Sequence, residues 1–357
     1  MEENKQHKTA LPETEPIPSA QAPEALLDIR GLRVEYHTDE DVVYAVNGLD
    51  LTIGKGESLG LVGETGAGKT TTALSVLRLI ADPPGKIMGG EIWFEGEDML
   101  QAKPARLREI RGSKISVIFQ DPMTSLNPVY SVGDQIAEVI HQHEKCSKEE
   151  GRRKAGDMLE MVGIPRARYD EYPHQFSGGM KQRVVIAMSI ACSPELILAD
   201  EPTTALDVPI QAQVLELMNE LKEKLRTSLL LITHDLGVVA QVCDRVAIMY
   251  AGEIVESGTI AEVFDHPHHP YTIGLFGSIP SLDETAEKLK PIQGQMPDPT
   301  ELPEGCAFAP RCPYATGACR TRKPEMTGVG GTQMVRCLAH QGVFESPELM
   351  EEVRHGR

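Results

Sequence analysis

The chain is organised around one eight-residue stretch, Gly63-Glu64-Thr65-Gly66-Ala67-Gly68-Lys69-Thr70. It fits G-x-x-x-x-G-K-[ST], the phosphate-binding loop. The apolar run 58–62 before it predicts a buried strand, and the composition of 71–80 after it predicts a helix. A strand, a glycine-rich loop and a helix in this order direct backbone N–H groups and the positive end of a helix dipole at one point. We therefore expect residues 63–70 and the adjacent Thr71 to bind a nucleotide's phosphates, with Lys69 on the β- and γ-phosphates and Thr70 on Mg²⁺.

The composition is that of a globular protein with an acidic balance. Of the 357 residues, 41% are hydrophobic and 25% are charged, which is enough apolar material to bury a core. The formal net charge of -18 argues against a duplex-DNA binder, which usually presents a basic face, so no nucleic-acid partner is expected. No apolar run reaches the ~18 residues of a membrane-spanning helix. Residues 1–23 are polar and proline-rich and predict a disordered tail, not a signal peptide.

Strands alternate with helices along most of the chain. The apolar runs 196–199 and 229–232 are continuous, as expected of buried parallel strands, and 210–225 between them has amphipathic helical spacing. Shorter strands are expected over 42–53, and a helical stretch over 131–163. This alternation indicates an α/β layer architecture.

The composition of the sequence changes after Phe264. The stretch 266–271, His-Pro-His-His-Pro-Tyr, predicts a proline-stiffened connector with surface imidazoles, although its three histidines leave a metal site open. Residues 281–303 are rich in Pro, Asp and Glu and predict a linker.

Polar side chains follow three of the predicted strands at the point where each strand ends. Asp200 and Glu201 follow the run 196–199, His234 follows the next apolar run, and Gln120 closes a strand at 115–119. In a phosphate-loop ATPase, an acid at such a strand end holds Mg²⁺. A second carboxylate beside it can orient or deprotonate the attacking water. We expect Gln120 to contact the metal or the water.

A second candidate anion site is the turn Ser177-Gly178-Gly179, which opens a predicted helix. One γ-phosphate does not need two such sites from one chain. The second turn is therefore expected to serve a nucleotide bound by a partner chain.

The order of these motifs resembles the ATP-binding cassette of ABC transporters. The resemblance implies a cassette over 24–265, with a RecA-like core, an antiparallel β subdomain and a helical subdomain at about 125–185. It implies that Ser177, Gly178, Gly179 and Gln182 of the signature motif complete the ATP site of the opposite subunit. It also implies that Glu201 is the catalytic carboxylate and His234 the switch histidine. Asp207 would lie in the loop that links the two sites, and Tyr36 would stack on adenine, with Tyr44 as the alternative.

The stretch 120–128, the connector 266–271 and a Cys-bearing tail together resemble the ATPase subunits of oligopeptide and dipeptide permeases, a group that includes nickel importers. The resemblance implies a small C-terminal domain over 266–357 and a peripheral location on the cytoplasmic side of the cell membrane. It implies two ATP molecules between two cassettes, the second cassette being the same chain or a paralogue. Two transmembrane permease subunits and an extracytoplasmic solute-binding protein would complete the importer. A nickel or other small-solute importer, and a soluble ABC ATPase of DNA repair or translation, are the alternatives.

Four cysteines stand close together in the tail: Cys306, Cys312, Cys319 and Cys337. The surrounding prolines and glycines predict a segment too small and too broken to bury a core, where a metal could supply folding free energy. Structural zinc usually takes thiols in pairs two to four residues apart, and none of these gaps is that short. A [4Fe–4S] cluster tolerates wider loops, and the family resemblance points the same way. We expect an iron–sulfur cluster, with zinc or free thiols as alternatives.

Overall fold

An eight-stranded sheet forms the centre of the molecule. The computed structural model describes residues 25–204, 206–278 and 292–355, so the expected tail over 1–23 lies outside the described residues. The strand order is β11-β12-β10-β9-β3-β8-β7-β6. The strands are β3 Ser58–Val62, β6 Ile115–Ile118, β7 Leu196–Asp200, β8 Ser228–Thr233, β9 Arg245–Tyr250, β10 Glu253–Thr259, β11 Thr327–Gly330 and β12 Gln333–Val335. The strands β9, β3, β8, β7 and β6 pair in parallel. The strands β10, β12 and β11 extend the sheet in antiparallel pairing.

The parallel strands are buried on both faces, as their continuous apolar sequences predict. In β8, Leu229 and Leu231 pack in the apolar cluster that contains the long helices. Leu230 and Ile232, which alternate with them, pack in a second cluster with the antiparallel sheet. The sheet therefore separates two cores, and its carboxyl edge carries the polar residues of the site.

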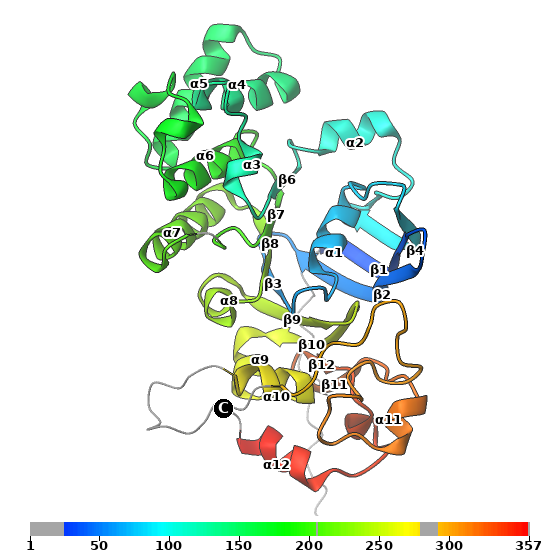
Figure 1. Ribbon diagram of the computed structural model, residues 1–357. Coiled ribbons are helices and arrows are strands. Elements are labelled where there is room, and N and C mark those ends of the chain that lie inside the picture. Colours follow the sequence, from blue (N-terminus) through cyan, green and yellow to red (C-terminus); the bar gives the residue numbers. More distant parts are fainter. Residues whose placement is uncertain (1–24, 205, 279–291, 356–357) are drawn as a thin grey trace, which may run out of the picture.

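A four-stranded antiparallel sheet covers one face of the central sheet (Figure 1). Its order is β2-β1-β4-β5, with β1 Ala25–His37, β2 Val42–Gly54, β4 Gly85–Phe94 and β5 Glu97–Asp98. The expectation of separate short strands over 42–53 is wrong, because β2 pairs with β1 along its whole length across several register irregularities. The helices α1 Lys69–Val76 and α2 Pro104–Ile110 lie beside this sheet (Figure 1).

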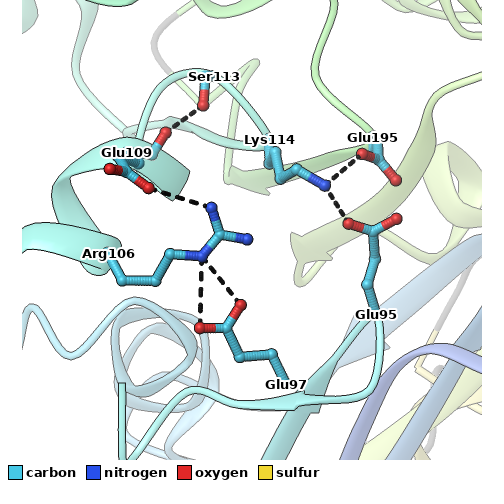
Figure 2. Close-up of polar contacts among 7 residues, drawn as sticks. All are labelled: Glu95, Glu97, Arg106, Glu109, Ser113, Lys114 and Glu195. Atoms are coloured by element: carbon cyan, nitrogen blue, oxygen red, sulfur yellow. Dashed lines mark hydrogen bonds and ion pairs between the residues drawn. The ribbon is translucent and has the colours of Figure 1, made fainter. Parts of the chain in front are cut away.

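A polar junction joins the two sheets (Figure 2). Lys114, just before β6, contacts Glu95 after β4 and lies 3.1 Å from a carboxylate oxygen of Glu195 before β7. Nε of Arg106 in α2 forms an ion pair with the carboxylate of Glu97 in β5, at 3.0 Å. These charged groups are partly exposed, so their ion pairs add little to the free energy of folding. Their main effect is to fix how the two sheets lie relative to each other.

The helices on the other side of the central sheet form the upper left of the molecule in Figure 1. They are α3 Pro122–Ser125, α4 Val132–His143, α5 Lys148–Met161, α6 Gly178–Ile190 and α7 Val208–Leu225. The helical stretch expected over 131–163 is two helices, because Ser131 and Ser147 each cap a new helix N-terminus through the side chain. Two 3₁₀ turns, Arg166–Arg168 and Pro173–Gln175, lead into α6. No helix among the described residues is long and apolar enough to cross a bilayer.

The C-terminal region shares the core of the cassette, so the expectation of a separate small domain is not confirmed. Residues 266–357 contain α10 Pro270–Phe276, α11 Gly317–Thr321, a 3₁₀ turn at Leu338–Gln341 and α12 Pro347–His355. The helices α8 Leu236–Val242 and α9 Ile260–Asp265 precede them. Strand β12 pairs with β10. Phe308 is 2% exposed and packs against Tyr250 and Tyr271, with ring centroids 5.2 and 5.5 Å away. The Cys-bearing segment thus buries Phe308 against the cassette core, beside a small cluster of its own around Ala309, Cys319 and Leu338.

The histidine connector is buried only in part: His266 is exposed, as expected of a surface imidazole, whereas His268 is half-buried and His269 is buried, against expectation. His269 is 1% exposed, and its Nδ1 accepts the N–H of Tyr271 at 3.0 Å, which caps α10. Burial lowers the pKa of His269 to about 3, so the ring is neutral near pH 7 and can accept this hydrogen bond. Glu256 of β10 accepts the N–H groups of His268 at 2.7 Å and His269 at 2.9 Å. Local composition suggested a surface turn because the buried partner, Glu256, is distant in sequence.

Candidate functional site

The phosphate loop lies between β3 and α1, at the carboxyl edge of the central sheet. A Cβ atom on Gly63 would stand 2.2 Å from the carbonyl oxygen of Met249. Gly68 has φ 102°, and a Cβ there would stand 2.3 Å from the carbonyl oxygen of Ala45. Both positions therefore require glycine, which lets the loop lie against two neighbouring strands.

Lys69 fills the centre of this loop. Its side chain is buried, and Nζ donates to the carbonyl oxygens of Gly63 at 2.7 Å and Glu64 at 2.9 Å. Burial lowers the pKa of Lys69, although the carboxylates of Glu201, Asp200 and Glu64 partly offset this effect. The loop thus holds a buried ammonium group where the motif predicts phosphate contact.

Asp200 ends β7 beside the phosphate loop. Its side chain is 7% exposed, and burial raises its pKa against the opposing hydrogen bond with the Thr70 hydroxyl. The structure thus brings together the two predicted Mg²⁺ ligands of the loop and of the strand end. A hydroxyl and a carboxylate are the hard oxygen donors that Mg²⁺ prefers, so the residues present fit this ion.

Glu201 is the point on which the other predicted catalytic residues converge. Its Oε2 accepts the Gln120 amide at 3.0 Å and the Thr204 hydroxyl at 2.8 Å. Nδ1 of His234 lies 3.1 Å from its Oε1. Burial alone would raise the pKa of Glu201, but the contacts with Thr204 and His234 outweigh it and lower the pKa. Glu201 is therefore a fixed carboxylate near pH 7, held at a backbone φ of 45° that is unusual for a glutamate.

The Ser177 turn opens α6 on the exposed surface. The Ser177 side chain accepts the N–H of Met180 at 3.4 Å and caps the helix. Ser177 and Gly178 are exposed, and Gly179 is half-buried because its backbone approaches Ile210 of α7. In Figure 1, α6 stands with the helices of the upper left, whereas α1 stands beside the antiparallel sheet. The two predicted anion sites of one chain therefore lie in different parts of the molecule.

Gln182, the last predicted residue of the signature motif, is buried in α6. It is 0% exposed, and neither atom of its amide group has a hydrogen-bond partner within the described structure. The predicted contact of Gln182 with a partner chain's nucleotide stays a prediction, and its amide would have to become exposed on pairing to make that contact.

The remaining predicted residues lie at the edges of the site. Asp207 is exposed and immediately precedes α7, two positions after Ala205, which lies outside the described residues. The hydroxyl of Tyr36 lies 3.3 Å from that of Thr71 in α1, so this tyrosine stands beside the phosphate loop. Tyr44, the alternative, is 38% exposed on β2.

Three residues near the loop escaped sequence analysis, and all belong to the C-terminal region. Arg311 lies 3.0 Å from the carboxylate of Glu64, and the Tyr271 hydroxyl accepts the N–H of Glu64 at 3.1 Å. Met296, within the expected linker, packs close to Gly66. The described part of that linker, from residue 292 on, therefore contacts the nucleotide site. No local sequence signal could have revealed these contacts.

The four tail cysteines line one cavity, together with Phe308 and Leu338. Burial raises the pKa of Cys306 to about 11 and that of Cys312 to about 12. Across residues 25–204, 206–278 and 292–355, however, no group of three or more His, Cys, Asp or Glu side chains is arranged to hold a metal ion. The iron–sulfur expectation is therefore not supported by this geometry.

Comparison with known proteins identifies the family. The model of the ABC transporter family matches residues 46–204, and that of the oligopeptide/dipeptide transporter C-terminal region matches 255–319. The oligopeptide transport ATP-binding protein OppD of Bacillus subtilis is 50% identical over 332 residues, covering 91% of this chain and 93% of its own. The chain belongs to the oligopeptide/dipeptide transport ATP-binding proteins of the ABC transporters. AppD of the same organism, another of these transport ATP-binding proteins, is 48% identical over 88% of this chain and 97% of its own.

Solved structures confirm the cassette fold of this oligopeptide/dipeptide transport ATP-binding protein. A dimeric ATP-binding cassette in a post-hydrolysis state with ADP and phosphate matches with a TM-score of 0.59 and 28% identity. The match covers 66% of this chain and 98% of that one. A cassette from Clostridium perfringens, part of an ABC transporter complex, matches with a TM-score of 0.58 and 27% identity over 67% of this chain and 90% of its own. The expected family, ABC cassette fold and ATPase character are thereby confirmed.

Proposed function

We propose that this chain hydrolyses ATP as one of two paired cassettes and thereby energises the import of oligopeptides or dipeptides through membrane permease subunits. The observation that carries the proposal is the fusion of an ABC cassette to the oligopeptide/dipeptide transporter C-terminal region in one fold. Both Bacillus relatives are named for oligopeptide transport, which favours peptides over nickel. The same matches favour transport over DNA repair or translation.

The proposed chemistry assigns each residue a separate task. Lys69 and the backbone N–H groups of the loop bind the β- and γ-phosphates. Thr70, Asp200 and Gln120 would hold Mg²⁺, which neutralises charge on the phosphate oxygens. Glu201 orients the attacking water and accepts its proton, and His234 keeps the carboxylate in position.

The proposed assembly uses the Ser177 turn in trans. The exposed N-terminus of α6, a helix of 13 residues, offers free N–H groups and a positive dipole end to the γ-phosphate bound by a partner cassette. Asp207 stands near this turn, because Leu206 approaches Gly178, and would carry contacts between the two sites. That the similar solved cassette is dimeric supports this arrangement.

The proposed importer contains further subunits. Two transmembrane permease subunits and an extracytoplasmic solute-binding protein would work with the paired cassettes. The chain would lie on the cytoplasmic side of the cell membrane and reach it through those subunits.

The tail cysteines are proposed to hold a [4Fe–4S] cluster, with zinc as the alternative. Their shared cavity supports this, because it gathers all four thiols at one place in the fold. Binding would require Cys306, Cys312, Cys319 and Cys337 to move closer together. The cluster would be structural or redox-sensing.

Co-purification from membranes, followed by uptake assays, tests the proposal. The full chain should bring down two permease subunits and a solute-binding protein. Vesicles containing this assembly should accumulate a labelled tetrapeptide in an ATP-dependent manner and should not accumulate ⁶³Ni²⁺. Uptake of nickel without peptide would replace peptide with nickel as the substrate, and isolation with nucleic acid or ribosomes would overturn the transport proposal.

A further inference from the structure

Glu64, the second residue of the phosphate loop, is held at two points by the C-terminal region. The hydroxyl of Tyr271 accepts its backbone N–H at 3.1 Å. Nη1 of Arg311 donates to both of its carboxylate oxygens, at 3.0 and 3.1 Å. These partners stand 207 and 247 positions further along the chain, so the nucleotide loop is connected to a segment outside the cassette motifs.

The guanidinium group of Arg311 is also held in place by contacts other than the one with Glu64. Its side chain is 6% exposed. Nε donates to the carbonyl oxygen of Gln293 at 3.1 Å, and Nη1 lies 3.4 Å from the hydroxyl of Tyr250. A buried cation with several fixed partners holds its charge in one place, and a hydrogen bond to a carboxylate is among the stronger polar contacts.

Glu64 needs this partner for an electrostatic reason. Its side chain is 32% exposed, and its own carbonyl oxygen accepts a hydrogen bond from Lys69 at 2.9 Å. An unpaired carboxylate at this position would repel the polyphosphate that the loop is built to bind. Arg311 neutralises that carboxylate and fixes the peptide that carries it.

We propose that Arg311 is a positioning residue for the ATPase, which acts through Glu64 to keep the phosphate loop in the shape and charge state that bind ATP. This inference rests on the proposed function. Cys312 follows Arg311 directly, and the N–H groups of both residues donate to the Phe308 carbonyl oxygen. A single turn thus links the cysteine cavity to the nucleotide loop, and nucleotide affinity depends on the order of the C-terminal region.

A double-mutant cycle on the full chain tests the proposal. The dissociation constant of a fluorescent ATP analogue with Mg²⁺ is measured for wild type, Arg311→Met, Glu64→Gln and the double variant. Arg311→Met should raise this constant about tenfold, whereas in the Glu64→Gln background the same change should raise it less than about twofold. In steady-state assays, Arg311→Met should raise KM and leave kcat within about twofold.

A matched control separates positioning from loss of structure. Arg336 is another arginine of the C-terminal region, is half-buried, and donates from Nε to the carbonyl oxygen of Ile254 at 2.9 Å, away from the phosphate loop. Arg336→Met should leave the dissociation constant within about twofold of wild type. If Arg311→Met does not fold, Arg311→Lys takes its place in the cycle, with an expected increase of about threefold.

Three results would overturn the proposal: unchanged affinity in Arg311→Met, an equal loss with and without the Glu64 carboxylate, or an equal loss in Arg336→Met. The proposed function fails separately, because it requires the wild-type chain itself to bind and hydrolyse Mg-ATP.

Discussion

Nδ1 of His234 lies 3.1 Å from Oε1 of Glu201, so the ends of the neighbouring strands β8 and β7 meet at one carboxylate. The other oxygen of Glu201, Oε2, accepts a hydrogen bond from the side-chain amide of Gln120 at 3.0 Å. A carboxylate held from two sides has little freedom to rotate, which is the condition for orienting a water molecule.

Replacement of His234 by alanine should slow turnover without weakening ATP binding. The imidazole is exposed, and among the residues that the structure describes its hydrogen-bond partner is Glu201 alone, so its loss frees one side of that carboxylate. We expect kcat to fall roughly tenfold to a hundredfold, with the dissociation constant for Mg-ATP within about twofold of wild type. Single-turnover phosphate release and equilibrium binding measure the two quantities. Unchanged kcat would remove His234 from the mechanism.

Mixing two inactive chains should restore hydrolysis if Ser177 acts in trans. Ser177→Arg blocks the turn that opens α6, and Lys69→Ala removes the ammonium group of the phosphate loop. When the chain pairs with itself, each mixed dimer keeps one intact composite site, which should hydrolyse ATP at up to about half the wild-type rate per dimer. Each variant alone, at the same total concentration, is the control. A monomer with full activity would contradict the assembly.

The pH dependence of stability should change when Glu256 is replaced by glutamine. Glu256 is fully buried, and burial raises its pKa to about 7 from 4.5. The folded chain therefore keeps a proton between these pH values that the unfolded chain releases, so this contribution to stability is present at low pH and is lost as pH rises to about 7. The wild type should lose on the order of 3 kcal/mol relative to Glu256→Gln between about pH 4.5 and 7.

Denaturant unfolding of both chains across this pH range measures that difference. Half-buried His268 and buried His269, whose pKa values are lowered by burial, titrate in both chains, so their contribution cancels in the comparison. Parallel stability curves for the two chains would show that Glu256 is ionised in the fold.

Anaerobic purification should decide what the four tail cysteines hold. A [4Fe–4S] cluster predicts brown protein, broad absorption near ~400 nm and about four irons per chain. Replacing Cys319 by serine should remove the colour, whereas the same change at Cys192, outside the cavity, should not. One zinc per chain in colourless protein would favour the zinc alternative, and metal-free folded protein would contradict both.

The parts of the site that lie close together in sequence could be predicted. The phosphate loop and the pair Asp200–Glu201 each follow a short apolar strand, and the carboxyl ends of parallel strands meet at one edge of the sheet. The order of these motifs along the chain was therefore enough to predict that they lie at the same edge of the sheet.

The parts that depend on distant partners could not be predicted. Arg311 reaches Glu64 across 247 positions, and no periodicity encodes such a contact. His269 stands in a proline-rich stretch typical of surfaces, yet its backbone N–H meets a buried Glu256. Gln182 belongs to a recognisable motif, but which face of α6 it occupies depends on how the helix packs.

Replacement of Glu201 by glutamine in the assembled transporter tests the central claim most directly. Glutamine keeps the size of the side chain and cannot accept the proton of the attacking water. Glu195→Gln, at the other end of the same strand and paired with Lys114, is the matched control and should keep turnover within about twofold. We predict that Glu201→Gln binds Mg-ATP with wild-type affinity, accumulates as a closed dimer and hydrolyses ATP at least about a hundredfold more slowly. Hydrolysis at the wild-type rate by Glu201→Gln would contradict the account.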